Sequence, residues 1–310
     1  MLFLGGGATP PELRQQLISA LGTNGPGAAP LVMADVEGGG IQRLQGAVDA
    51  FPWPRELTAT KSVGEIRDLA RIVGQEMMRA GVNVDLAPVV DLDDRRGPSI
   101  ANPDGSRSFS INPAVAGAYG VAFMHGLRDA GVVPVVKHFP GLGGSTQNTD
   151  YGPAATRPWS QLRTTGLKPF IAEIAANAPA IMISNASVPG LTTKPASVSR
   201  AVVHDLLRTQ LGFSGLVVTD SLSAGAIRAA GYTVAQAAAA AIEAGADLVL
   251  FGSTLTPADT ALLSPANVAA TRQTIISALA AAVATGELTP PRLDEAVAHV
   301  LVAKGVNVCG

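Results

Sequence analysis

The sequence contains almost no cysteine. Cys309 is the only one among 310 residues, so neither a disulfide framework nor a cysteine-based metal site can form within this chain. No His-x-x-x-His pair and no cluster of histidines and carboxylates at ligand spacing occurs along the sequence. A catalytic metal is therefore not expected.

Long runs of one charge sign are also missing. The 22 basic and 24 acidic residues are interspersed, which offers no electrostatic footprint for nucleic acid or for an anionic membrane. The glycines at 38–40 lack the spacing and the following lysine of a phosphate-cradling loop. We therefore expect no nucleotide or other cofactor, no nucleic-acid partner, and a small substrate of little charge.

Long apolar runs are absent as well. No segment reaches the roughly 18 consecutive apolar residues that a membrane-spanning helix needs, and the first residues lack the basic start and cleavage site of a signal peptide. A cytosolic protein fits these features, and so does a secreted one whose N-terminal segment lies outside the sequence. The late start of the chain and the place of Cys309 favour an extracytoplasmic location.

Short runs of Val, Ile and Leu alternate with helical patterns, which is typical of a parallel sheet covered by helices. We predict seven strands, at residues 1–5, 31–36, 84–92, 132–139, 180–184, 216–220 and 247–251. Helix start signals stand between them. The signals are a capping box of Ser62 with Glu65, Asn112 and Ser264 each before a proline, Ser199, and Thr289.

The positions of polar residues at the strand ends distinguish a predicted barrel from a predicted doubly wound sheet. In a barrel the chemistry gathers at the carboxyl ends of many strands, whereas a nucleotide fold concentrates it at one crevice. Nearly every predicted strand here ends in a polar residue. We predict one α/β domain over residues 1–310, a (β/α)8 TIM-type barrel. The chain opens directly on a strand, so we expect the first βα unit to be missing.

Asp220 ends an apolar strand, where the backbone reaches the mouth of the predicted barrel. A carboxylate there is costly unless it is hydrogen-bonded or used. The alternative is an ordinary N-cap of the helix that follows.

Lys137 and His138 end another strand, and a loop with Gly143 and Gly144 runs on to Asp150. Buried lysines are rare without a partner or a function, and His138 is either a ligand-binding group or a packed imidazole beneath the site. The paired glycines allow a mobile loop. Arg107 precedes a capped helix, and its alternative is a surface ion pair with Asp104.

Five ordered blocks resemble the barrel domain of glycoside hydrolase family 3, in particular its single-domain exo-β-N-acetylglucosaminidases. They are Ala34-Asp35-Val36-Glu37-Gly38-Gly39 with Gln42-Arg43, Leu86-Ala87-Pro88-Val89-Val90-Asp91, Ser106-Arg107-Ser108-Phe109, Lys137-His138-Phe139-Pro140-Gly141, and Leu211-Gly212-Phe213 leading into Thr219-Asp220. The resemblance covers nearly the whole chain. It implies a retaining β-glycosidase that acts on cell-wall-derived or other β-linked sugars.

The resemblance also implies roles for single residues. Asp220 is expected to attack the anomeric carbon. The residues expected around the terminal sugar are Asp35, Arg43, Asp91, Arg107, Lys137, His138 and Asn148.

The sequence departs from the family at the second catalytic group. The glucosaminidases carry a His after the glycine that closes the Lys-His-Phe-Pro-Gly block, and later an Asp-Ser-His whose His is the acid/base. This chain has Leu142 and Asn148-Thr149-Asp150 instead. Our leading hypothesis is that Asp150 itself is the acid/base, with a pKa raised by the closed site and by Asp220.

Three alternatives remain at this stage. The substitution is compatible with a different sugar specificity, or with a carbohydrate-binding protein in which Asp150 is a solvated turn residue. An aldolase or another lyase on the same barrel would use Lys137 as a Schiff-base amine.

Overall fold

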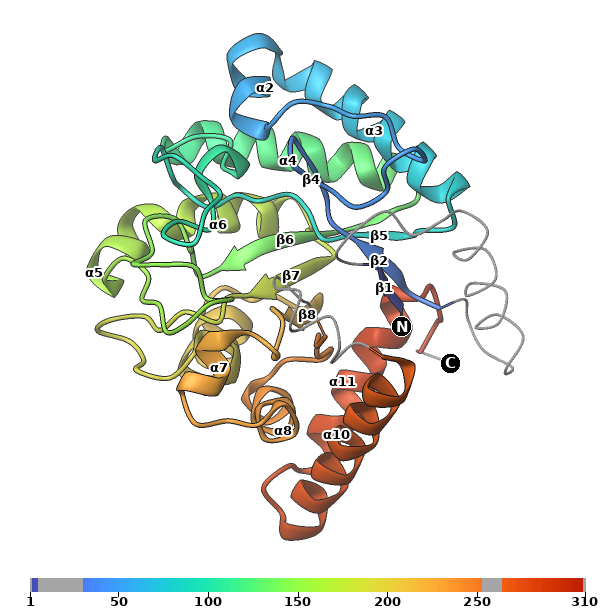
Figure 1. The fold of residues 1–310 in the computed structure, drawn as a ribbon, viewed down its shortest axis with the longest axis vertical. Helices are drawn as coiled ribbons and strands as arrows, with labels where there is room; N and C mark the ends of the chain where they lie inside the picture. The colour runs from blue at the N-terminus through green and yellow to red at the C-terminus, as the bar shows by residue number, and fades with distance from the viewer. Residues whose placement is uncertain (1, 5–29, 253–263, 309–310) are drawn as a thin grey trace.

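The computed structural model describes residues 2–4, 30–252 and 264–308, and one parallel β-sheet forms its centre. The strands of this sheet are β1 (Leu2–Leu4), β2 (Val32–Ala34), β5 (Val84–Asp85), β6 (Val133–Phe139), β7 (Ala180–Ile183) and β8 (Leu216–Thr219). Each strand pairs in parallel with the next one along the chain. Figure 1 shows the curled sheet with helices on its outer side.

The strand order identifies the fold class. A doubly wound sheet reverses its order at a switch point, but the order β1-β2-β5-β6-β7-β8 never reverses among the described strands. Crossovers that always step in one direction leave the helices on one face, and the sheet curls toward a barrel. The predicted (β/α)8-type barrel is therefore confirmed, here as an incomplete barrel.

Three predicted strands differ in detail from the observed ones. The segment 31–36 divides into β2 and the first strand of a hairpin, β3 (Val36–Gly38) with β4 (Ile41–Gln42). The segment 84–92 is regular only in β5 and touches β6 again through the bridge of Val89 to Lys137. The segment 247–251 lies beside β8 as predicted, but a single bridge from Leu248 to Val218 replaces a strand.

The α-helices in the described residues are α2 (Pro54–Thr60), α3 (Val63–Arg79), α4 (Pro113–Asp129), α5 (Trp159–Gln161), α6 (Leu167–Ala175), α7 (Gly225–Ala229), α8 (Val234–Ala244), α10 (Pro265–Thr285) and α11 (Pro290–Ala303). Of these helices, α3, α4, α10 and α11 begin at predicted caps. The side chains of Ser62, Asn112 and Ser264 cap α3, α4 and α10 as expected. Thr289 precedes α11 without a side-chain cap bond. The helix expected after Ser199 is a π-helix, η4 (Ala201–Gln210).

Alternate residues of the strands face two different layers. Met33, Val135 and Val218 belong to an inner cluster enclosed by the sheet. Val136 and Val217, their neighbours in sequence, pack outward with the helices. Because successive strand side chains point to opposite faces, apolar residues at consecutive positions are what a sheet buried on both faces requires.

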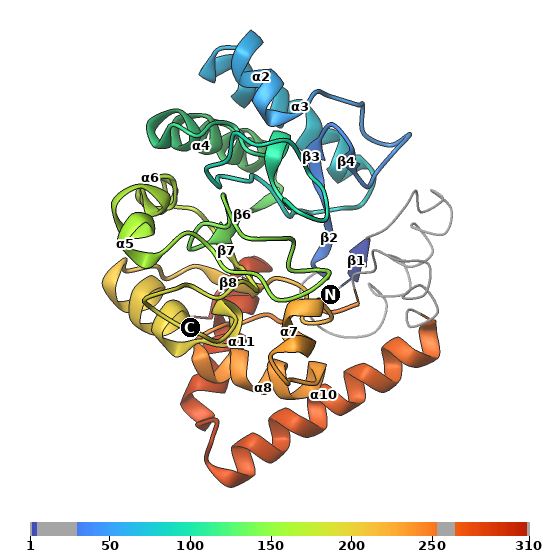
Figure 2. The ribbon, with the colours of Figure 1, turned by 60° about the vertical axis from the view of Figure 1, so that its left-hand side comes forward.

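One described helix is long and apolar enough to cross a membrane by length and composition, namely Ala266–Thr285 in α10, with a mean hydropathy of 1.3. In the fold it lies along the edge of the molecule (Figure 2) and packs against α8. This arrangement is that of a surface helix of the barrel.

Glu173 of α6 is fully buried, and neither of its carboxylate oxygens has a hydrogen-bond partner. It faces Gly120 of α4 so closely that a Cβ there would lie 2.4 Å from Oε1 of Glu173. Burial alone raises the pKa of Glu173 well above its usual range, because a charged carboxylate without donors is expensive in the interior.

Replacement of Glu173 by methionine is expected to stabilise the protein at neutral pH. A raised folded-state pKa contributes stability that is complete below the unfolded pKa and is lost as pH rises through the folded one. The loss is about 1.4 kcal/mol for each unit by which burial raises the pKa. Urea unfolding from pH 4 to pH 8 measures it. Glu173→Met should flatten the decline, whereas the same change at the exposed Glu243 should not. A parallel decline in both variants would contradict the assignment.

Candidate active site

The predicted site residues converge at the carboxyl end of the sheet. Asp35 directly follows β2, Lys137 and His138 lie near the end of β6, and Asp220 directly follows β8. Parallel strands bring their carboxyl ends to the same edge. Asp220 does not cap α7, since that helix begins after Ala224 and has no side-chain cap bond. Its Oδ1 accepts instead from the N–H of Ser221 at 2.6 Å.

A β-bulge turns Lys137 and His138 toward the same site. Between Val136 and Phe139 the strand β6 advances three residues while its partner β7 advances two, from Ile181 to Ile183. Such a bulge breaks the alternation of side chains and re-aims them, often beside active sites. Two consecutive residues can therefore both contribute to the site.

Glu37 is the centre of a buried ion cluster. It accepts hydrogen bonds from Nε and Nη2 of Arg107 at 2.7 and 2.9 Å. Nζ of Lys137 lies 2.6 Å from Oε1 of Glu37 and 2.7 Å from Oδ1 of Asp35. Arg107 is therefore a buried partner of Glu37, and the alternative of an isolated surface pair with Asp104 does not apply.

The charges of this cluster fix its protonation. Burial works against the ionised form of Glu37, yet Arg107 and Lys137 hold its pKa well below the usual range. Burial also opposes the charge on Lys137, but Asp35 and Glu37 outweigh it and raise the pKa of the amine. A Schiff-base lysine needs the neutral amine, so the aldolase alternative is disfavoured.

His138 is buried and held by Asp91. Its Nδ1 lies 2.7 Å from Oδ2 of Asp91, and its backbone N–H donates to the same oxygen at 2.9 Å. Burial, reinforced by the charges of Arg107 and Lys137, lowers the pKa of His138 to about 4. The imidazole is therefore neutral, and the hydrogen-bond network assigns the proton to Nδ1 and leaves Nε2 as an acceptor.

Asp104 lies beside this pair and has no hydrogen bond to either carboxylate oxygen. Oδ1 is 3.8 Å from Nη1 of Arg107 and 4.0 Å from Nδ1 of His138. Burial and the charge of Asp91 raise the pKa of Asp104 to about 7. Burial likewise raises the pKa of Asp91 to about 7, against the hydrogen bonds from Leu142 and His138.

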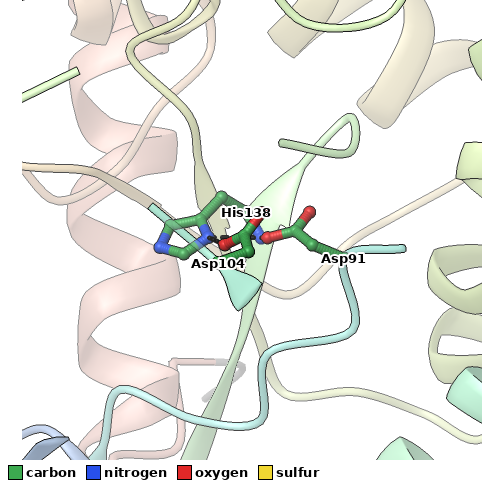
Figure 3. Close-up of side chains that lie close together, drawn as sticks. All are labelled: Asp91, Asp104 and His138. Atoms are coloured by element: carbon green, nitrogen blue, oxygen red, sulfur yellow. Dashed lines mark hydrogen bonds and ion pairs between the residues drawn. The ribbon is translucent and has the colours of Figure 1, made fainter. Parts of the chain in front are cut away.

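Figure 3 shows Asp91, Asp104 and His138 close together, and one ligand atom from each lies within 4.8 Å of the others. The sequence does not reveal this group, because its members lie far apart in the chain. Oδ2 of Asp91 already accepts two hydrogen bonds from His138, and the positive Arg107 adjoins Asp104. Both features disfavour a cation, so we interpret the group as the support of the His138 ring.

Asp150 and Asp220 interact electrostatically across the mouth, and both are partly exposed. Burial raises the pKa of Asp220, and the charge of Asp150 is the next largest cause. Burial also raises the pKa of Asp150, while Arg107 and Lys137 lower it and Asp35 raises it. Asp150 therefore faces the charged groups of the site and is not a fully solvated turn residue.

The loop from Gly141 to Gly152 is held at many points. Asp91 accepts from the N–H of Leu142 at 2.6 Å, and Asp93 accepts from that of Gly144 at 3.2 Å. The paired glycines serve close contact, since a Cβ on Gly143 would lie 2.2 Å from the carbonyl oxygen of Leu92. These contacts give the two glycines a packing role, and mobility of the loop stays a prediction.

Two of the predicted substrate-binding residues have mainly supporting contacts. Oδ1 of Asn148 accepts from the N–H of Asp150 at 3.0 Å, which fixes the turn that presents Asp150. The backbone N–H of Arg43 donates to the carbonyl of Asp35 at 3.0 Å. Contact of Arg43 or Asn148 with a sugar stays a prediction. Sequence reasoning did not select Glu37 or Asp104, although Glu37 stands in the same motif as Asp35.

Comparisons with known proteins agree on one family. The family described as "Glycosyl hydrolase family 3 N terminal domain" matches residues 8–303. The chain is 37% identical over 296 residues to the beta-hexosaminidase LpqI of Mycobacterium tuberculosis, covering 92% of this chain and 71% of that protein.

Solved structures agree with the sequence match. A family 3 glycosyl hydrolase of Mycobacterium smegmatis superposes with a TM-score of 0.82 at 36% identity, over 96% of this chain and 86% of that one. A beta-N-acetylhexosaminidase of Beutenbergia cavernae gives 0.84 at 32% identity, over 98% and 88%.

Glu37→Gln is expected to destabilise the protein by about 3–5 kcal/mol at pH 7, because two buried cations lose their shared counter-charge. The lowered pKa of Glu37 means that its contribution is present above the unfolded pKa and is lost as pH falls through the folded value. Urea unfolding provides the measurement. Asp129→Asn, which breaks the exposed pair with Arg67, is the control and should change little. Equal effects of the two variants would refute the role of Glu37.

Proposed function

The chain belongs to glycosyl hydrolase family 3, and from this we propose that it is a retaining, exo-acting β-glycosidase specific for β-linked N-acetylhexosamine, with Asp220 as nucleophile and Asp150 as acid/base. The sugar follows from the relatives named as hexosaminidases. The observation that carries the catalytic assignment is that the N–H of Gly225, at the start of the helix after Asp220, donates to the carbonyl of Asp150 at 2.9 Å, so the two residues lie near each other. The charge of Asp150 is accordingly one cause of the raised pKa of Asp220.

The first half of the reaction forms a bond between Asp220 and the sugar. The carboxylate attacks the anomeric carbon while the glycosidic C–O bond breaks and its electron pair passes to the leaving oxygen. Protonated Asp150 donates its proton to that oxygen. The raised pKa of Asp150 suits this step, because the acid must keep its proton near neutral pH.

The second half releases the sugar. The ionised Asp150 takes a proton from water, the water oxygen attacks the anomeric carbon from the opposite side, and the bond to Asp220 breaks with return of its carboxylate. Two inversions give net retention. Through this cycle Asp35, Lys137 and Arg107 provide charged hydrogen-bonding groups for the hydroxyls and substituents of the terminal sugar. The ion pairs of Lys137 with Asp35 and of Arg107 with Glu37 hold them in place.

The nucleophile assignment predicts that Asp220→Asn lowers the turnover of an aryl β-N-acetylglucosaminide by roughly 10³-fold or more, because the amide cannot form the covalent intermediate. Steady-state kinetics measures the loss, and circular dichroism checks the fold. Asp294→Asn on the exposed face of α11 is the control and should retain full activity. Turnover of Asp220→Asn within a few fold of the parent would exclude the nucleophile role.

The acid/base assignment predicts a loss that depends on the leaving group. Asp150→Ala should lower kcat/KM by roughly 10²-fold or more for alkyl glycosides, whose leaving oxygen needs a proton, and far less for a dinitrophenyl glycoside. Azide, which attacks the intermediate without general-base help, should restore turnover of the dinitrophenyl substrate. Equal losses for the two substrate classes, without azide rescue, would assign Asp150 a merely structural role.

A further inference from the structure

The loop that carries Asp150 rests on the start of the helix that follows the nucleophile. The N–H of Gly225 donates to the carbonyl of Asp150 at 2.9 Å, and the N–H of Ala226 donates to the carbonyl of Thr149 at 2.9 Å. The first N–H groups of a helix have no partner within the helix. Here no side chain caps α7, and the main chain of the Asp150 loop satisfies these donors.

Only glycine fits at the point of contact. A Cβ on Gly225 would lie 2.6 Å from the carbonyl carbon of Tyr151, 2.7 Å from its oxygen and 2.8 Å from the nitrogen of Gly152. All three atoms belong to the backbone, so no flexible side chain can move aside. The close approach is what lets the hydrogen bonds of Gly225 and Ala226 form at normal length.

The turn that connects Asp220 to Gly225 is itself fixed to the sheet. Asn185 donates through Nδ2 to the carbonyl of Ser221 at 2.7 Å, and the N–H of Leu222 donates to the carbonyl of Leu250 at 2.8 Å. On its other side the loop is attached to the segment before α4, since the N–H of Asn148 donates to the carbonyl of Ile100 at 3.0 Å. The residues that carry both carboxyl groups, Asp150 and Asp220, are therefore linked by one network of main-chain hydrogen bonds.

We propose that Gly225 is a positioning residue for the acid/base, because its contact with the Asp150 loop sets the spacing between Asp150 and Asp220. This inference rests on the proposed role of Asp150 as acid/base. Preorganised placement matters because a displacement of about 1 Å costs roughly 10²-fold in rate.

Gly225→Ala tests the proposal. The methyl group should push the loop outward, so kcat/KM for alkyl glycosides should fall roughly 10- to 100-fold. The kcat/KM for the dinitrophenyl glycoside reports only formation of the intermediate, which depends on Asp220 and needs no proton from the acid, so it should stay within about threefold and thereby report an intact fold. Gly64→Ala in the first turn of α3, where a Cβ meets nothing within 4 Å, is the matched control and should change neither substrate.

The pH profile provides a readout that a structural defect would not move. Burial raises the pKa of Asp150, and a loop pushed outward exposes the carboxyl to water and lowers its pKa again. The acid works only when protonated, so the basic limb of kcat/KM in Gly225→Ala should shift to lower pH. An unshifted limb with equal losses on both substrates would overturn the proposal.

Hydrogen exchange of the unmodified protein gives a test that needs no variant. The amides of Gly225 and Ala226 should be as strongly protected as those of the sheet, and rapid exchange would overturn the proposal. The variant Asp150→Ala distinguishes the failure of the acid/base role of Asp150 from the failure of the positioning role of Gly225. A leaving-group-dependent loss in Asp150→Ala but not in Gly225→Ala overturns only the positioning role, whereas no such dependence in Asp150→Ala overturns both.

Discussion

An excess of carboxyl groups over cations governs the chemistry of this site. The cations Arg107 and Lys137 lie among a larger number of carboxyl groups, which include Asp35, Glu37, Asp91, Asp104, Asp150 and Asp220. Both cations bind Glu37 directly. A buried carboxylate without a counter-ion holds a proton more tightly than one in water, and the remaining groups compete for little positive charge. Burial is the largest cause of the raised pKa values of Asp91, Asp104, Asp150 and Asp220, and a neighbouring carboxylate adds to it in each case.

The sequence predicts most of the fold because its local signals agree with the final packing. Ser62 with Glu65 and Asn112 before Pro113 fix helix starts through bonds within four residues, and such bonds form in the structure as expected. Strand positions follow from apolar runs. The segment 247–251 is less regular because its pairing depends on β8 and not on its own composition.

The sequence predicts only part of the site, because some of its residues become buried or paired only in the folded chain. Asp220 and Lys137 are recognisable because a charged residue at the end of an apolar strand has few alternatives. Asp104 gives no such signal, since it stands in a polar loop and becomes buried only through tertiary contact. The bulge in β6 depends on the register with β7, which no local pattern encodes. Glu37 is visible in its motif, but its double pairing with Arg107 and Lys137 is a property of the folded chain.

The position and the protonation of Asp150, the proposed acid, are set by different parts of the molecule. The place of Asp150 depends on main-chain bonds to Gly225 and Ala226, which are indifferent to the side chain carried by the loop. Its protonation depends on burial and on the collective charge of the site. In the proposed mechanism, the loop therefore does not need a histidine to supply the proton, because burial raises the pKa of Asp150. A carboxyl group placed where the surroundings already favour its neutral form meets the same requirement.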